Sequence, residues 1–253
     1  MSDSTTHPIE YGLIGKKLSH SFSKKYFTRK FQREGIPSAY ELYELEEADE
    51  LPALLAQQPQ LKGINVTIPF KKKVLKYLDE LSHDAKSIGA VNTIKVGPGP
   101  RLVGYNTDCY GFEESLRGFL GGQSIDRALV LGTGGAAQAI IYVLEEWDID
   151  YRMVSRNPSE SNQISYSEVY DLDLTLIPLL INTTPLGMYP VVDQAPDLPY
   201  EDLGSDHFVY DLVYNPEETE LMKRAATQGA KTCNGLRMLE LQAEKAWEIW
   251  QGR

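Results

Sequence analysis

A glycine-rich turn between an apolar run and a helical pattern is the clearest chemical signal in the sequence. Residues 129–131 are Leu-Val-Leu, and Gly132, Gly134 and Ala137 then satisfy the spacing G-x-G-x-x-G/A. In that pattern the first glycine permits a tight turn, the second admits a pyrophosphate, and the small third residue lets helix and strand pack closely. Backbone N–H groups at the helix start stabilise the anion. The turn predicts dinucleotide binding; the alternative is a tight turn without a ligand.

The next strand refines the expected cofactor. About 20 residues past the turn an NAD site offers Asp or Glu to the ribose 2′-hydroxyl, whereas this chain reads Val154-Ser155-Arg156-Asn157. The planar guanidinium of Arg156 can pair with two oxygens of a 2′-phosphate. NADP is therefore favoured over NAD, against the alternative of a solvated surface arginine. Glu160 would oppose a phosphate if its side chain pointed inward.

Polar residues in the first part of the chain are spaced so that they could bind a small ligand. Ser21 and Ser23 precede a helical pattern, and Asn65 and Thr67 alternate on one face of an apolar run. Taken singly they have simpler explanations, because serines cap helices. Lys71 begins a run of three lysines that suits a solvated helix face. Asp108 precedes a helical pattern and has the simple reading of an N-cap.

Alternating strand and helix patterns must position these residues. In the first part, strands are expected at 11–14, 39–45 and 64–68, helices at 23–34, 51–57 and 70–78, and a hairpin from 91–96 and 101–105 around Gly97-Pro98-Gly99-Pro100. In the second part, strands are expected at 128–131, 151–155, 176–181 and 208–211, and helices at 110–119, 134–147, 216–228 and 236–250. Repeated βαβ units imply parallel sheets with right-handed crossovers. Residues 106–108 are the expected domain junction.

Composition narrows the classes of protein. The 253 residues are 42% hydrophobic and 24% charged, which is typical of a globular chain that forms one large or two modest domains. A net charge of −11 argues against nucleic-acid binding, which needs clustered Lys and Arg.

Two distant cysteines, Cys109 and Cys233, are expected to be reduced thiols, and the four histidines have no metal-ligand spacing, so no metal is expected. Residues 1–10 lack a signal-peptide pattern and no stretch is apolar enough to span a membrane. The cytoplasm is the expected location.

Eight stretches in this order resemble the shikimate dehydrogenase family over nearly the whole chain. They are Ser19-His20-Ser21-Phe22-Ser23, Gly63-Ile64-Asn65-Val66-Thr67-Ile68-Pro69-Phe70-Lys71, Gly89-Ala90-Val91-Asn92-Thr93, Gly104-Tyr105-Asn106-Thr107-Asp108-Cys109-Tyr110-Gly111, the glycine turn 132–137, Ile181-Asn182-Thr183-Thr184-Pro185-Leu186-Gly187-Met188, Asp211-Leu212-Val213-Tyr214-Asn215-Pro216 and Asn234-Gly235-Leu236-Arg237-Met238-Leu239 with Gln242-Ala243. Their conjunction is highly specific, although any one could arise by chance.

The resemblance implies an oxidoreductase that reversibly reduces 3-dehydroshikimate to shikimate with NADPH, on the pathway to chorismate and the aromatic amino acids. It implies an α/β fold with a substrate domain (1–107 and 236–253) and a Rossmann-type doubly wound NADP domain (108–235), the C-terminal helix returning to the first domain. Lys71 and Asp108 are the implied catalytic pair. The implied substrate contacts are Ser21, Ser23, Asn65, Thr67, Asn92, Tyr214 and Gln242, and the implied cofactor contacts are Gly132, Gly134, Gly135, Ala136, Arg156, Thr183, Gly235 and Met238.

The sequence departs from the family pattern at several positions. Lys17 and Lys24 stand where proline is common, and Glu160 falls where a second arginine often lies. Arg237 and Pro185 replace a frequent glycine and serine. Two alternatives stay open: a quinate/shikimate dehydrogenase that uses NAD, and a dinucleotide-sensing protein that keeps the fold without the chemistry. The expected partner is the small-molecule substrate, with no nucleic acid or membrane, and the chain is expected to be a monomer or homodimer.

Overall fold

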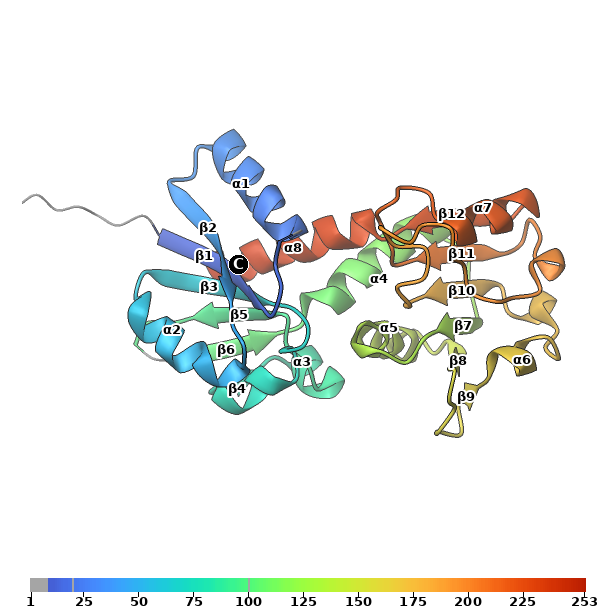
Figure 1. Ribbon diagram of the computed structural model, residues 1–253, viewed down its shortest axis with the longest axis horizontal. Coiled ribbons are helices and arrows are strands. Elements are labelled where there is room, and N and C mark those ends of the chain that lie inside the picture. Colours follow the sequence, from blue (N-terminus) through green and yellow to red (C-terminus); the bar gives the residue numbers. More distant parts are fainter. Residues whose placement is uncertain (1–8, 20, 100) are drawn as a thin grey trace, which may run out of the picture. The chain divides into compact units, whose positions relative to one another are not determined.

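The computed structural model describes residues 9–19, 21–99 and 101–253, and it divides into two compact units, each built on a six-stranded sheet (Figure 1). The first unit comprises residues 1–110 and 242–253, and the second comprises residues 111–241. The segment 1–8, which holds most of the stretch tested for a signal peptide, lies outside the described residues, as do His20 of the serine motif and Pro100 of the expected turn.

The sheet of the first unit is mixed and has the strand order β2-β1-β3-β5-β6-β4. Its strands are β1 (Ile9–Gly15), β2 (Ser38–Glu44), β3 (Leu61–Val66), β4 (Glu80–Leu81), β5 (Thr93–Val96) and β6 (Leu102–Tyr105). β1 pairs in parallel with both β2 and β3, and β5 pairs antiparallel with β3 and β6. The β5–β6 pairing confirms the predicted hairpin.

Helices and short 3₁₀ turns complete this unit. They are α1 (Phe22–Glu34), η1 (Ala48–Glu50), α2 (Leu51–Gln57), η2 (Lys73–Tyr77) and α3 (His83–Ile88), joined by the end of α8 (Leu236–Gln251). An aromatic core lies between α1, α8 and one face of the sheet. There Tyr11 stacks on Trp250 with ring centroids 4.9 Å apart, and the Trp250 indole donates to the carbonyl oxygen of Ile94 at 3.1 Å. This packing fixes the carboxyl-terminal half of α8 against the first unit.

The sheet of the second unit is entirely parallel and has the order β12-β11-β10-β7-β8-β9. Its elements are α4 (Thr107–Leu120), which begins in the first unit, then β7 (Arg127–Leu131), α5 (Gly135–Glu146), β8 (Asp150–Val154), β9 (Gln163–Ile164), α6 (Tyr166–Val169), η3 (Leu174–Leu176), β10 (Leu179–Asn182), η4 (Tyr200–Asp202), β11 (Phe208–Asp211), α7 (Glu220–Thr227) and β12 (Lys231–Asn234). From β7 the chain runs outward to β9 and then returns to the other side of β7, so the strand order reverses between β7 and β10. Ligands of doubly wound sheets bind at the carboxyl ends of the strands beside such a reversal.

Several predicted boundaries are wrong for identifiable reasons. The strand expected at 64–68 ends at Val66, and Ile68 is 72% exposed. The helix expected at 216–228 begins only at Glu220, because the Thr219 hydroxyl caps it by accepting from the Met222 N–H. The helix expected at 70–78 is only the short turn η2. The strand expected at 176–181 is 3₁₀ turn η3 followed by β10.

Candidate active site

Lys71 and Asp108 form an ion pair in the first unit. Lys71 Nζ lies 2.7 Å from Asp108 Oδ2, and the side chains are 23% and 17% exposed. Lys71 follows β3, and Asp108 lies in the first turn of α4, which begins one residue earlier than Asp108, contrary to the prediction. Asn106 Oδ1 accepts from the N–H groups of Asp108 and Cys109, so Asn106 rather than Asp108 acts as the helix cap. The Asp108 carboxylate is thereby left to face the lysine.

Asn92 holds the other oxygen of the Asp108 carboxylate. Its Nδ2 donates to Asp108 Oδ1 at 2.8 Å and to Thr107 Oγ1 at 3.0 Å, while its Oδ1 accepts from the Thr107 N–H at 2.7 Å. Asn92 is 3% exposed. Because one oxygen binds Lys71 and the other binds Asn92, the carboxylate plane is fixed and the ammonium is held at one place.

Further predicted residues of the first unit join this network. Asn65 Nδ2 donates to Thr93 Oγ1 at 3.0 Å and to the Asn92 carbonyl oxygen at 3.3 Å. Gln242, carried by α8, is buried, and its Oε1 accepts from Thr107 Oγ1 at 3.4 Å. Asn65, Asn92, Gln242, Lys71 and Asp108 therefore lie in one connected set. Thr93 and Thr107 belong to it but were not predicted; their burial, which only the fold reveals, is what marks them.

The remaining substrate-side candidates have more varied settings. Ser21 caps α1 by accepting from the Lys24 N–H at 3.2 Å, which agrees with the simpler reading of this serine. Ser23 is half-buried in the first turn of the same helix, and Thr67 is half-buried just after β3. Tyr214 belongs to the second unit, where burial raises the pKa of its phenol.

The glycine turn of the second unit is shaped to receive an anion. Gly132 follows β7 with φ 104°, and a Cβ there would lie 2.7 Å from Thr183 Oγ1, so only glycine fits. A Cβ built on Gly134 or Gly135 meets no atom within 4 Å, so a ligand can approach this backbone closely. Helix α5 begins at Gly135 without a side-chain cap, which leaves its first N–H donors for an anion. The residues present therefore fit a dinucleotide pyrophosphate.

The other cofactor-side candidates all lie in the second unit. Ala136 is exposed beside the turn, and Thr183 Oγ1 donates to the Leu131 carbonyl oxygen at 2.8 Å, which joins the end of β7 to the loop after β10. A Cβ on Gly235 would lie 2.2 Å from the carbonyl oxygen of Leu212, so two backbone segments approach closely there. Met238 is buried on α8.

Arg156 is exposed just beyond β8, and among the described residues no acid lies within ion-pair distance of it. Burial raises the pKa of Tyr166, and the positive charge of Arg156 opposes part of that increase. Glu160 is also exposed. The guanidinium is thus available to an external phosphate.

A buried carboxylate that the sequence did not single out lies beside the strand reversal. Asp211 at the end of β11 is fully buried, and burial raises its pKa. It accepts from Asn182 Nδ2 at 2.9 Å, from the Val213 N–H at 3.0 Å and from Thr219 Oγ1 at 2.6 Å. The carboxylate therefore ties together the chain segments that leave β10 and β11 on the ligand side of the sheet.

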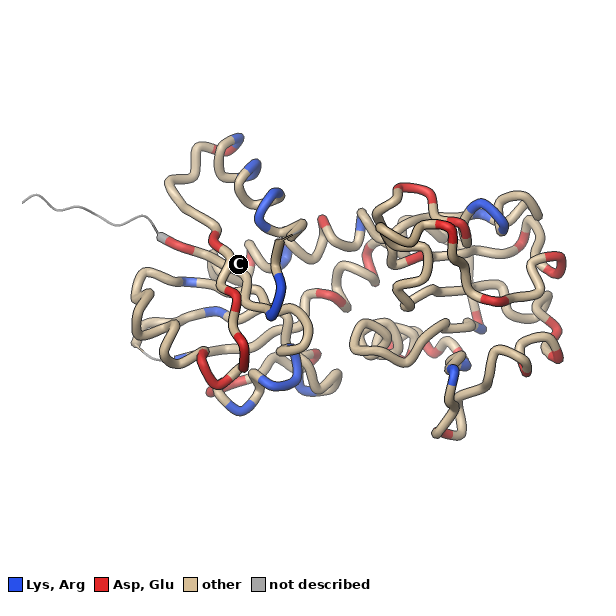
Figure 2. The backbone as a smooth tube through the Cα atoms, viewed as in Figure 1, with Lys and Arg blue, Asp and Glu red and all other residues tan. Residues whose placement is uncertain are grey.

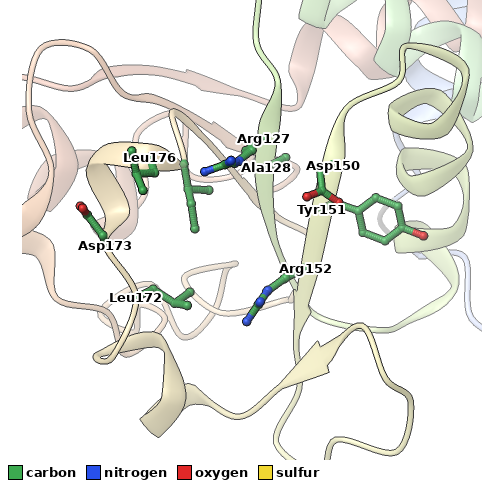
Figure 3. A pocket seen from close by; sticks show the side chains of 9 residues that line it. Arg127, Ala128, Asp150, Tyr151, Arg152, Leu172, Asp173 and Leu176 are labelled. Carbon is green, nitrogen blue, oxygen red and sulfur yellow. The ribbon is translucent and has the colours of Figure 1, made fainter.

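A cavity of about 330 Å³ lies at the opposite, amino-terminal ends of β7 and β8 (Figure 3). Its lining carries both signs of charge, with Arg127 and Arg152 against Asp150 and Asp173. The Asp173 side chain already caps η3 by accepting from the Thr175 N–H. Since the glycine turn is at the other ends of these strands, this cavity is not the dinucleotide site.

Within residues 9–19, 21–99 and 101–253, no group of three or more His, Cys, Asp or Glu side chains is arranged to hold a metal ion. Among the helices described there, none combines the length and the apolar character needed to cross a bilayer. Cys109 and Cys233 are not joined in a disulfide, and Cys109 Sγ donates to the Asn106 carbonyl oxygen at 3.0 Å. Figure 2 shows acidic and basic residues distributed over both units.

A doubly wound unit with a phosphate-binding turn, joined to an α/β unit that carries a partly buried Lys–Asp pair, defines the class of two-unit dinucleotide-dependent dehydrogenases. Residues 13–94 match the family described as the shikimate dehydrogenase substrate binding domain. A curated relative from Clostridium beijerinckii, named shikimate dehydrogenase (NADP(+)), is 41% identical over 95% of this chain and 91% of its own length. The chain belongs to the shikimate dehydrogenase family, as the sequence resemblance predicted.

Solved structures agree with this assignment and confirm the predicted fold class. The shikimate 5-dehydrogenase of Thermus thermophilus, solved in complex with NADP(H) and shikimate, is 30% identical with a TM-score of 0.83 over 97% of this chain and 94% of that one. The quinate dehydrogenase of Corynebacterium glutamicum, solved in complex with NAD, has a TM-score of 0.88 at 27% identity, with 97% and 94% of the two chains covered. The fold is therefore shared by enzymes that differ in substrate and cofactor.

Proposed function

We propose that this protein is an NADP-dependent shikimate dehydrogenase, which catalyses the reversible reduction of 3-dehydroshikimate to shikimate. The observation that carries the proposal is the Lys71–Asp108 pair, held at 2.7 Å by a buried network in a chain of this family. A sensor that only binds a dinucleotide has no need to bury such a network. Arg156, just beyond β8, is exposed, and the end of that strand carries no acidic residue; both features support NADP rather than NAD.

The lysine performs the proton chemistry. Reduction of the ketone leaves negative charge on the carbonyl oxygen, which the Lys71 ammonium stabilises and then protonates to give the alcohol. NADPH, when bound, supplies the two electrons and the hydrogen that the ketone carbon gains. Asp108 holds the ammonium toward the oxygen. After Lys71 has given up its proton, Asp108 takes part in the relay that returns a proton from solvent to the lysine. In the reverse direction Lys71 accepts the hydroxyl proton.

The other predicted substrate contacts bind and orient the substrate. Ser21 and Ser23 donate to its carboxylate from the start of α1. Asn65, Thr67, Asn92 and Gln242 hold the ring hydroxyls, and Tyr214 approaches the carboxylate. These roles follow from the matching positions of the family motifs, and the amides of Asn65 and Asn92 already have fixed orientations.

The second unit holds the cofactor. The turn residues Gly132, Gly134, Gly135 and Ala136 present backbone N–H groups to the pyrophosphate, and Arg156 pairs with the 2′-phosphate. Thr183, Gly235 and Met238 border the nicotinamide. The functional division is a substrate domain of residues 1–107 and 236–253 and an NADP domain of residues 108–235.

A four-way activity assay tests the proposal. Purified protein is mixed with shikimate or quinate and with NADP or NAD, and the absorbance of the reduced nicotinamide is followed. Turnover is expected with shikimate and NADP. Quinate turnover equal to that of shikimate, or a preference for NAD, would establish the quinate/shikimate alternative, and no turnover in any combination would establish the sensor. Sedimentation of the same sample distinguishes the monomer from the homodimer. The predicted location is the cytoplasm.

A further inference from the structure

A buried tyrosine next to the candidate substrate residues has no role in the function described so far. Tyr40 lies on β2 and is 2% exposed. Its ring stacks on Phe27 with centroids 4.7 Å apart and planes 11° from parallel. Stacking on an apolar neighbour explains the ring but not the hydroxyl, which must find a partner when it is buried.

That partner is a predicted substrate contact. Tyr40 pairs with Tyr11 in the β1–β2 register, and Leu13 of β1 pairs with Asn65 of β3, so Tyr40 and Asn65 share one face of the sheet. The Tyr40 hydroxyl reaches across β1 and donates to Asn65 Oδ1 at 2.7 Å. Asn65 Nδ2 is committed to the Asn92 carbonyl oxygen and to Thr93 Oγ1. An amide turned over would set Oδ1 against the Asn92 carbonyl oxygen and Nδ2 against the phenol proton, so the carbonyl and the phenol together select one orientation.

The same hydroxyl also meets the start of α1. Burial raises the pKa of Tyr40, and a hydrogen bond with Ser23 opposes that change. The one phenol proton is donated to Asn65 Oδ1, so Asn65 is the residue that Tyr40 orients. Ser23 and Asn65 come from different elements, α1 and β3, and Tyr40 is their common neighbour.

We propose that Tyr40 is a positioning residue of the substrate site, whose buried hydroxyl holds the Asn65 amide in the orientation in which it binds substrate. The inference rests on the proposed function, because it requires Asn65 to contact shikimate. A residue of the sheet, Tyr40 on β2, thus orients a side chain that contacts the substrate.

The test is Tyr40→Phe, which keeps the stacked ring and removes the hydroxyl. The KM for shikimate should rise about tenfold, the size expected when a site loses one preorganising hydrogen bond, while the KM for NADP stays within about twofold. Tyr11→Phe is the matched control. Tyr11 is also buried in this aromatic core, pairs with Tyr40 in the sheet and loses a hydroxyl bonded to Gln251 instead of Asn65. It should lower the melting temperature similarly without changing either KM.

The double variant Asn65→Ala with Tyr40→Phe separates positioning from general destabilisation. If Tyr40 acts through Asn65, most of its effect on the shikimate KM is absent when Asn65 is already truncated. An unchanged shikimate KM in Tyr40→Phe, or an equal rise in Tyr11→Phe, would overturn the inference and leave the proposed function intact. A wild-type protein that oxidises no shikimate would instead overturn the proposed function, and the inference with it.

Discussion

Replacing Lys71 by alanine is the most direct perturbation of the proposed chemistry. The ammonium lies 2.7 Å from Asp108 Oδ2, and Asn92 independently holds Oδ1, so the carboxylate stays in place when the lysine is removed. The neighbouring cation Lys73 is exposed and paired with Glu47, which leaves it unable to substitute. The variant therefore loses the proton donor and the charge that stabilises the oxygen, without losing the surrounding structure.

The size of the effect follows from that geometry. General acid catalysis contributes about 10²–10⁴-fold, and loss of one electrostatic donor lowers kcat by about 10²–10³-fold. One ammonium performs both roles, so the two factors do not multiply. We expect kcat to fall about 10³-fold, equivalent to about 4 kcal/mol of barrier, and the KM for shikimate to rise less than about tenfold, since a single ground-state hydrogen bond is lost.

Steady-state kinetics of shikimate oxidation with NADP measures both parameters. Lys72→Ala is the control, because Lys72 adjoins Lys71 in the same lysine run but is exposed. Its kcat should match the wild type. The reasoning is refuted if Lys71→Ala retains kcat within about tenfold of the wild type, or if its KM rises more than its kcat falls.

Three further changes test the cofactor site, the packing of α8 and the buried carboxylate. Arg156→Ala should raise the KM for NADP at least about tenfold and leave the KM for NAD unchanged; an equal rise for both cofactors would contradict recognition of the 2′-phosphate. Gly63→Ala should lower the free energy of unfolding by about 1–3 kcal/mol, since its Cβ would lie 2.3 Å from Trp250 Nε1; Gly118→Ala on α4, where a Cβ meets nothing within 4 Å, is the control and should not destabilise. Burial raises the pKa of Asp211 above 3.8, so the folded state binds its proton more tightly than the unfolded state. Its contribution to stability is complete below 3.8 and is lost as the pH rises through the folded-state pKa. In urea titrations from about pH 4 to 7, the unfolding free energy of the wild type minus that of Asp211→Asn should therefore fall with rising pH, and a flat difference would show that Asp211 does not titrate differently on folding.

Local sequence chemistry predicted the features that depend on neighbouring residues. The turn after β7 needs glycine at position 132, where φ is 104°, and a small residue at Ala137, which is fully buried. Strand β11 and helix α2 have the predicted boundaries. The apolar run that predicts β11 and the helical period that predicts α2 both end where the elements end. Lys71 and Asp108 drew attention only through the family motifs, since either residue alone suits a solvated surface or a helix cap.

Residues far apart in the sequence acquire their roles only through the tertiary structure. Asn106 takes the cap of α4 and so leaves Asp108 to Lys71, a competition between adjacent residues that spacing does not resolve. Tyr40 reaches Asn65 because two parallel pairings place β2 and β3 on either side of β1.

The sequence by itself determined the chemical types present, the turn that binds a pyrophosphate and the family. Only the tertiary structure decided which buried polar groups face one another. The physical reason is that each buried donor must find an acceptor. Tyr40 and Asn65 are 25 residues apart and Thr107 and Gln242 are 135 apart, so strand register and helix packing decide which donor meets which acceptor.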